Sequence, residues 1–421
     1  MDAPAGTPLP APLQTAGDCQ VAQCDGNGGT KLAVDDTDVP VDGNDCTQDL
    51  CTSGVPSNPA LPVGSACSQD GGELCDAASP TPKCNHMLAY VVVGDGSGTL
   101  TATSATVSIA YVFADGTAGK KATDISGGAT FSLSGSATSE GGLSRSVDTR
   151  YVTLAGYAAA PGTGSVSTSS SSSTNRAVAR VDASGAIDAS TLLAGAFSGS
   201  NVRGVTTIDG SAFWISGNSS GSTGGIWYAP LGLGASAAQL TGQSAPANPP
   251  SNVRFSGIFG DQLFVTSGSS PFVGASSVGA SPPPTALSTA TNLSGTSTSG
   301  TNTPSPYGLV LFDLDASTPG LDTLYLCDDR STANGGGIQK WKLGAGGAWA
   351  LSTTFKNGLT AGCRGLTGWV SGTSVVLAAT TSDTPSKVVA VTDDGSAAPA
   401  FTTLATATTN IVFRGVALAP R

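Results

Sequence analysis

The fold is decided by a short stretch near the end of the chain, Val412-Phe413-Arg414-Gly415-Val416-Ala417-Leu418. Here an arginine followed by a small residue opens an apolar run, and five related stretches occur upstream. The residues at the arginine position are Arg145, Arg203, Arg254, Tyr307, Arg364 and Arg414. They are separated by 58, 51, 53, 57 and 50 residues. A period of this length is typical of a propeller or a repeat array.

Most of the six stretches are followed by three further short apolar runs, with Gly, Ser and Asp turns between them. After Arg364, for example, these runs are Ser374–Ala379, Lys387–Thr392 and Phe401–Ala405. The chain has few Glu, Lys and Gln residues and many β-branched residues, which favours strands over helices. Four short strands per repeat make one propeller blade, so six repeats predict six blades.

The two ends of the repeat region complement one another. The region begins at a second strand, Leu88–Gly94, and ends on a first strand, Val412–Leu418. Pairing of these two strands would complete one blade and leave no free edge in the ring. We therefore predict an all-β protein in which residues 87–421 form a six-bladed β-propeller, closed by pairing of its N- and C-terminal strands.

The composition excludes some classes of function. The 421 residues carry a formal net charge of −11, and only 11% of them are charged. An acidic surface repels nucleic acid, so a nucleic-acid partner is not expected. No run of 18 apolar residues occurs, so we expect no membrane-spanning helix.

Seven of the nine cysteines lie in residues 18–86, a Gly/Pro/Asp-rich segment behind a flexible leader, residues 1–17. This density predicts a small disulfide module and an oxidising compartment. The candidate disulfide cysteines are Cys19, Cys24, Cys46, Cys51, Cys67, Cys75 and Cys84. A zinc site is the alternative, but the C-x4-C spacing and the single histidine, His86, fit it less well. An odd number leaves one thiol free, or paired outside this sequence.

The remaining two cysteines, Cys327 and Cys363, lie in neighbouring blades. One ends a second strand and the other opens the next first strand, so both are expected on the same face of the propeller. Adjacent blades can bring them within the distance that a disulfide needs. We predict this bond; two separate buried thiols are the alternative.

An acidic loop separates the two C-x4-C pairs. Asp36, Asp38 and Asp42 alternate along it and are followed by Gly43, as in loops that offer several oxygen ligands to calcium. These three are candidate calcium ligands, and calcium is the one candidate cofactor. Pro40 and the lack of a closing glutamate depart from the EF-hand pattern, and an acidic solvated loop is the alternative.

The arginine positions form the candidate ligand site. The first strand of each blade lines the central channel, so these side chains are expected as a ring at one mouth, near Asp95 and Asp328. Such a ring would attract a carboxylate, sulfate or phosphate. In the alternative, each arginine lies between blades and bonds carbonyls or a carboxylate. The carboxylates considered are Asp148, Asp209 and Asp313.

Two parts of the chain resemble known families. Leu324-Tyr325-Leu326-Cys327-Asp328-Asp329-Arg330, followed by Gly337-Ile338-Gln339-Lys340-Trp341, resembles a blade of the NHL-type β-propellers. The cysteine-rich segment, with Asp45-Cys46-Thr47-Gln48-Asp49-Leu50-Cys51, resembles modules in secreted or surface proteins of myxobacteria, and Arg414-Gly415-Val416-Ala417 is similar to the ending of bacterial surface propellers. These resemblances imply a location more than an activity.

The sequence therefore predicts a secreted or cell-surface binding or scaffold protein that uses the propeller face or the channel mouth. Its expected partners are a surface glycan, a protein or a small anionic ligand, and self-association is open. The opening Met1-Asp2-Ala3-Pro4 is interpreted as the start of a trimmed chain whose export signal has been removed. The alternative is an enzyme, either a metal-dependent, lactonase-like hydrolase or a lyase. We assign no catalytic residue, because no Ser-His-Asp set or nucleophile elbow is present.

Overall fold

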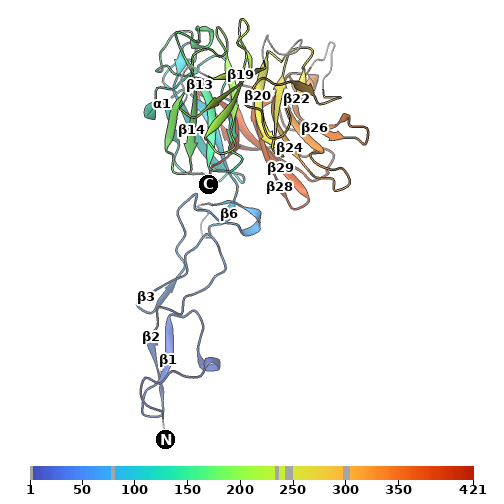
Figure 1. Cartoon of the computed structure of the whole chain (residues 1–421). Helices are drawn as coiled ribbons and strands as arrows, with labels where there is room; N and C mark the ends of the chain where they lie inside the picture. The colour runs from blue at the N-terminus through green and yellow to red at the C-terminus, as the bar shows by residue number, and fades with distance from the viewer. Residues whose placement is uncertain (1–2, 77–80, 233–236, 242–249, 297–303) are drawn as a thin grey trace. The chain divides into compact units, whose positions relative to one another are not determined.

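The computed structural model describes residues 3–76, 81–232, 237–241, 250–296 and 304–421. The chain divides into two compact units, which Figure 1 draws from blue at the N-terminus to red at the C-terminus. The smaller unit is Met1–His86 with Thr117–Gly119. The larger unit is Met87–Gly116 with Lys120–Arg421.

The larger unit contains six four-stranded antiparallel sheets. The first strands are β12 (Leu143–Arg145), β16 (Val202–Thr206), β20 (Val253–Phe259), β24 (Pro306–Phe312), β28 (Cys363–Ser371) and β32 (Val412–Leu418). Each first strand contacts the next, and β32 contacts β12, so the six strands form a closed ring. The predicted six-bladed β-propeller is confirmed.

The outer strands follow each first strand in chain order. In the second to fourth blades they are β13 (Tyr151–Tyr157), β14 (Arg176–Asp182), β15 (Ile187–Leu193), β17 (Ala212–Gly217), β18 (Gly225–Pro230), β19 (Ala238–Thr241), β21 (Gln262–Ser267), β22 (Gly274–Val278) and β23 (Ala290–Asn292). In the fifth and sixth blades they are β25 (Thr323–Asp328), β26 (Gly337–Leu343), β27 (Trp349–Phe355), β29 (Ser374–Thr381), β30 (Lys387–Asp393) and β31 (Thr402–Thr406).

The first blade is built from both ends of the unit. Its strands are β7 (Met87–Val93), β9 (Val107–Phe113), β10 (Thr123–Asp124) and, from the end of the chain, β32. In the β7–β32 pair Val416 lies opposite Tyr90 and Leu418 lies opposite Leu88. The predicted closure by terminal strands is therefore confirmed, and it joins residues more than 300 positions apart through backbone hydrogen bonds.

Short strands and helical turns lie in the connections between the blade strands. They are β8 (Ser104–Ala105), β11 (Leu133–Ser134), α1 (Ile125–Gly128) and the 3-10 turns η3 (Val166–Thr168) and η4 (Thr332–Asn334). No helix in the described ranges has the length and apolar character needed to cross a membrane.

The hydrophobic core lies between neighbouring blades. Each sheet therefore packs against a neighbouring sheet on both of its faces. Tyr90 and Phe413 of the first blade pack with Val388 of the sixth. In the fifth and sixth blades, Cys327 and Cys363 lie in a shared cluster and form the predicted disulfide, with an S–S distance of 2.04 Å. Burial on both faces explains why the strands read as nearly continuous apolar runs.

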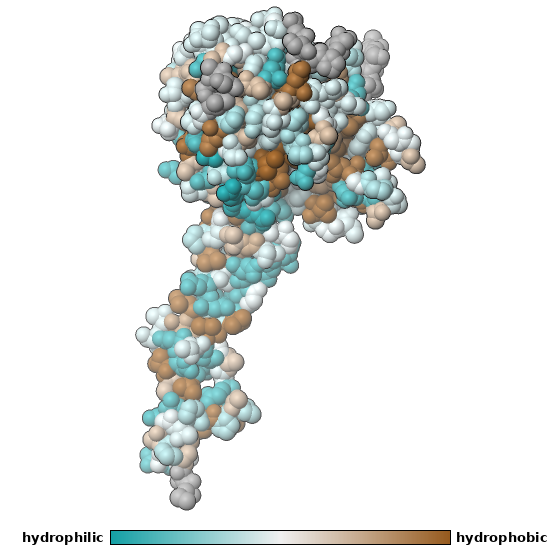
Figure 2. Space-filling model, in the orientation of Figure 1, coloured by the Kyte–Doolittle hydropathy of each residue, from teal (hydrophilic) through white to brown (hydrophobic). Residues whose placement is uncertain are grey.

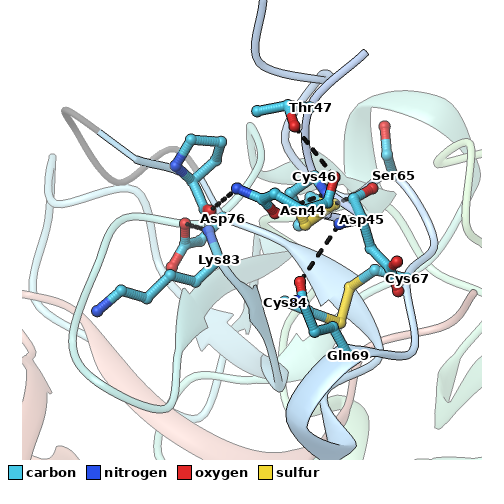
Figure 3. Close-up of a disulfide and its surroundings, with 12 residues drawn as sticks. Asn44, Asp45, Cys46, Thr47, Ser65, Cys67, Gln69, Asp76, Lys83 and Cys84 are labelled. Atoms are coloured by element: carbon cyan, nitrogen blue, oxygen red, sulfur yellow. Dashed lines mark hydrogen bonds between the residues drawn. A yellow bond between two sulfur atoms is a disulfide. The ribbon is translucent and has the colours of Figure 1, made fainter. Parts of the chain in front are cut away.

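The smaller unit is held by disulfides. It contains three two-stranded sheets and two 3-10 turns. These are β1 (Gln20–Cys24) with β2 (Thr30–Val34), β3 (Leu50–Thr52) with β4 (Val55–Ser57), β5 (Leu74–Cys75) with β6 (Cys84–Asn85), η1 (Ala11–Leu13) and η2 (Gln69–Gly71). The disulfides are Cys19–Cys51, Cys46–Cys75 and Cys67–Cys84, the last of which is visible in Figure 3.

Few large apolar side chains of this unit are buried, and Leu32, Val34 and Val55 are exposed; brown patches mark apolar residues on its surface in Figure 2. Covalent links therefore replace a core here. The prediction of a disulfide at Cys24 is wrong. Its partner across the β1–β2 ladder is Thr30, and Cys24 is the free cysteine.

The leader predicted to be flexible is hydrogen-bonded to β1. The Leu9 amide donates to the Ala22 carbonyl, and the Gln14 side chain both donates to and accepts from Ala22. Composition did not predict these bonds. The side-chain contacts come from one residue, Gln14, which has little weight in the composition of a segment.

Val416→Asp tests the closure of the ring. Val416 is fully buried in the β7–β32 pair. An uncompensated charge there should lower the free energy of unfolding by about 3–5 kcal/mol. Denaturant unfolding measures the loss. Val370→Asp, at a half-exposed position of β28, is the control and should change stability little; equal effects of the two substitutions would contradict the role of the β32 closure.

Removal of the interblade disulfide by the double substitution Cys327→Ala/Cys363→Ala should also destabilise the propeller. The bond closes a loop of 36 residues, for which loop-closure entropy predicts a loss of about 4 kcal/mol. Urea denaturation of the oxidised proteins measures it, and Cys24→Ala is the matched control because that thiol is unpaired. An unchanged urea midpoint in the double variant would contradict this predicted loss of stability.

Candidate functional site

A backbone irregularity positions the arginines. In β16 the pairing with β17 shifts register between Val202 and Gly204, which takes Arg203 out of the ladder. Register shifts also occur around Arg254, Tyr307, Arg364 and Arg414 in their strands. A β-bulge of this kind re-aims the side chain of the extra residue. The repeated motif is therefore a repeated bulge at one end of the channel.

Arg145 does not belong to this set, and its assignment to the arginine position is wrong. Gly365 packs against the Arg414 carbonyl and the Val416 amide, and Gly415 packs in the same way against Gly141 and Leu143. Gly141 is therefore the counterpart of Arg414 in the second blade, and Arg145 lies four residues further along. There it lines a different cavity and donates a hydrogen bond to the Ala419 carbonyl at 3.3 Å.

The arginine side chains border a small cavity, here called the arginine pocket. It measures about 70 Å³, and its lining includes Glu140, Arg254, Tyr307, Arg364 and Arg414. These residues come from five different blades or the loops before them. The pocket thus exists only because the ring is closed.

Arg414 and Glu140 form a buried ion pair at one side of the pocket. Both residues are almost fully buried, and Arg414 Nη1 lies 3.6 Å from Glu140 Oε2. Arg414 Nη2 donates to the Ser134 and Gly135 carbonyls, while Glu140 accepts from the Tyr157 hydroxyl at 2.6 Å. Burial lowers the pKa of Arg414 and raises the pKa of Glu140. Among the described residues, Arg414 Nε and Nη1 have no hydrogen-bond partner.

Tyr307 is sandwiched between two guanidinium groups. Arg254 lies 4.5 Å and Arg364 lies 5.5 Å from the centre of its ring. Arg364 is also paired with Asp329 at 3.0 Å. Cation–π contacts of this kind hold both guanidinium groups beside the pocket.

Arg203 and Arg254 have no acidic partner within the described residues. Arg203 donates to the side-chain oxygen of Asn252, and Arg254 donates to the Ser305 hydroxyl at 2.6 Å. Burial lowers the pKa of Arg203 to about 10, so it is still charged at neutral pH. The Nε atoms of Arg203 and Arg254 are buried without a hydrogen-bond partner. The guanidinium group of Arg254 therefore lines the pocket without an acidic partner among the described residues, whereas Arg203 does not line the pocket.

The arginines also tie blades together, as the structural alternative proposed, but the carboxylates involved are Glu140 and Asp329. Of those considered from the sequence, Asp148 pairs with Arg150 and Asp209 accepts from Ser211. Asn252 and Ser305 were missed as well. Each lies two residues before the arginine position of its own blade and accepts a hydrogen bond from the arginine of the preceding blade. A polar residue at this repeat position is the signal in the sequence that could have identified them.

The predicted acidic members of the site do not line the arginine pocket. Asp95 accepts hydrogen bonds from Ser97 and borders a separate cavity. Asp328 is fully buried and holds Arg330 through both carboxylate oxygens, at 2.9 and 2.8 Å. The Asp328 carboxylate therefore stabilises the fifth blade, and it is not available to a ligand.

The three candidate calcium ligands do not converge. Asp36 accepts from the Ser53 and Gly54 amides, and Asp38 accepts from the Gly17 and Asp18 amides. Asp42 accepts from Thr47 and Asn44. In the part of the chain that the structure describes, no metal-type cluster of three groups includes these carboxylates. Each aspartate instead fixes a turn, which is the solvated-loop alternative.

Comparisons with known proteins add little beyond these observations. No family model and no curated protein matches the chain. Among solved structures it is similar to a periplasmic gluconolactonase of Pseudomonas aeruginosa, with 13% identity, 75% of this chain and 82% of that chain covered, and a TM-score of 0.41. It is also similar to TolB of Acinetobacter baumannii, with 13% identity, 80% and 67% covered, and a TM-score of 0.44. Similarity at this level carries no argument about function.

Glu140→Gln tests the buried pair. The amide keeps the shape of the carboxyl group but cannot ionise, so the difference between the two proteins in the pH dependence of the free energy of unfolding reports the titration of Glu140. Because burial raises the pKa of Glu140 above its ordinary 4.5, the folded wild type takes up a proton before the unfolded chain does. Its stability relative to Glu140→Gln should therefore grow as the pH falls toward that value. Denaturant unfolding at several pH values measures this.

Asp148→Asn is the control of opposite sign. Partial burial acts to raise the pKa of Asp148, but hydrogen bonds from Ser146 and Arg150 outweigh it and lower this pKa. The stability that this carboxylate contributes is present above its unfolded pKa and is lost as the pH falls. The same direction of pH dependence in both variants would contradict the assignment for Glu140.

Proposed function

We propose that this protein is an exported binding protein whose arginine pocket holds a small anionic ligand without catalysing a reaction. The observation that carries the proposal is Arg254, whose guanidinium group lines a cavity formed by five blades and has only neutral acceptors among the described residues. Isolated charges in a buried setting are costly unless an opposite charge is present. A bound carboxylate, sulfate or phosphate would supply that charge through strong charge-assisted hydrogen bonds.

The chemistry of the pocket contrasts with the rest of the chain. The net charge of the chain is −11, yet three arginines line the pocket against two carboxylates, Glu140 and Asp383. Arg364 is partly accessible, with its side chain 24% exposed. An acidic group of a surface glycan or of another protein would meet the same donors as a free small anion.

An extracellular or periplasmic location is the setting that we propose. It is supported by four disulfides, two of which close loops of about 30 residues in the small unit. Such bonds form and persist in oxidising compartments.

The enzyme alternative has less support. A metal-dependent hydrolase or lyase needs several carboxylates that converge on one ion. At this mouth Asp328 and Asp329 are already engaged by Arg330 and Arg364. Across the described ranges, the one group with metal-type spacing is Cys46, Cys67 and Cys75, whose sulfurs are in disulfides.

Calorimetric titration with malonate, sulfate and phosphate tests the proposal. Wild type should bind at least one of these anions, and Arg254→Met should weaken that binding about tenfold or more, because a charge-assisted hydrogen bond is lost. Arg150→Met is the control, since that arginine is exposed and pairs with Asp148 elsewhere. Absence of anion binding by wild type, or equal binding by both variants, would refute the proposal.

A further inference from the structure

Among the six blades, the position after the arginine position is glycine in all except one. The residue after the arginine position is glycine in five blades, and these glycines are Gly142, Gly204, Gly308, Gly365 and Gly415. In the fourth blade it is Phe255. Gly308 and Gly365 face the backbone of the next first strand so closely that a side chain has no room between the strands. A large side chain at this level has to extend into the channel.

The position of the Phe255 ring agrees with this geometry. Phe255 belongs to β20 of the fourth blade, yet its ring lies against Gly142 of the second blade. It also contacts Gly257 of its own strand and is only 6% exposed. The ring therefore reaches across the channel at the level of the glycines.

Phe255 stands between two cavities. It lines the arginine pocket and also a second cavity of about 300 Å³, here called the apolar pocket. The apolar pocket is lined by the far ends of the first strands, including Ile258, Leu311 and Leu418, together with polar residues such as Arg145 and Thr206. Phe255 is the residue that the linings of these two cavities share.

We infer that Phe255 is the floor of the arginine pocket and restricts its ligand to a compact anion without an alkyl tail. This inference rests on the proposed function. With the phenyl ring in place, an anionic group can meet the guanidinium groups, but a tail has no path into the apolar pocket. Without the ring, the two cavities join into one channel with a cationic mouth and an apolar bore, which fits a straight-chain carboxylate.

Titration with a series of straight-chain carboxylates, from acetate to octanoate, tests this role. In wild type the affinity should not rise with chain length, because the tail stays in water. In Phe255→Ala it should rise about threefold to fourfold per methylene group once the tail passes the level of residue 255, as expected for burial of apolar surface. Malonate is titrated in parallel and should bind both proteins.

Phe264→Ala is the matched control. Phe264 is equally buried in the same cluster as Phe255 but lines neither cavity. It should show the flat series of wild type, so a general loosening of the core is distinguished from an opened floor. If Phe255→Ala does not fold, Phe255→Leu replaces it and should show a smaller rise with chain length.

The outcomes separate the two proposals. Wild type that binds malonate but also gains affinity with chain length would overturn the role of Phe255 and leave the anion site intact. The same holds if Phe255→Ala and Phe264→Ala behave alike. Wild type that binds none of malonate, sulfate, phosphate and the monocarboxylates would overturn the anion site, and the inference about Phe255 with it. Binding of sulfate or phosphate alone would keep the anion site and overturn the inference about carboxylate tails.

Discussion

The close approach of neighbouring first strands is the constraint on which the rest of this structure depends. At Gly365 the next strand's backbone leaves no space for a Cβ atom, and at Gly415 the last strand meets the second blade in the same way. Strands this close form a narrow channel and bring side chains of five blades into one cavity. The bulge beside each glycine turns the preceding residue out of the ladder. Ring closure and the arginine pocket therefore have one physical origin.

Electrostatics at the pocket follows from burial in this ring. Arg414 and Glu140 neutralise one another in a site that excludes water, and Arg364 is neutralised by Asp329. Arg203 and Arg254 are left with neutral oxygen acceptors. The arginines therefore have two roles that the sequence had presented as alternatives. They connect blades through polar groups of the next or preceding blade, and the charges that this leaves uncompensated make the cavity attractive to an anion.

The repeat predicted the fold well because each copy is a local pattern with a local consequence. A turn, an apolar run and an arginine followed by a small residue specify a first strand wherever they occur, and the complementary truncation at Leu88 and Leu418 predicted the closure. The same local reasoning failed at Arg145. There the true counterpart is Gly141, which lacks the side chain that marked the other copies. The odd number of cysteines predicted one unpaired thiol, but spacing did not reveal that it is Cys24, because the residue opposite a strand position depends on the fold.

The sequence by itself determined the number of blades, the closing strand pair and the Cys327–Cys363 bond, because these depend on the order and period of short segments. Only the tertiary structure decided which groups meet at the channel mouth. Glu140 directly precedes Gly141, the counterpart of Arg414 in the second blade, and the misplaced alignment at Arg145 hid it. Phe255 occupies a position where composition alone cannot distinguish a core residue from a channel floor. Their roles arise from contacts between blades that are distant in the chain, and such contacts are fixed by packing in three dimensions rather than by local pattern.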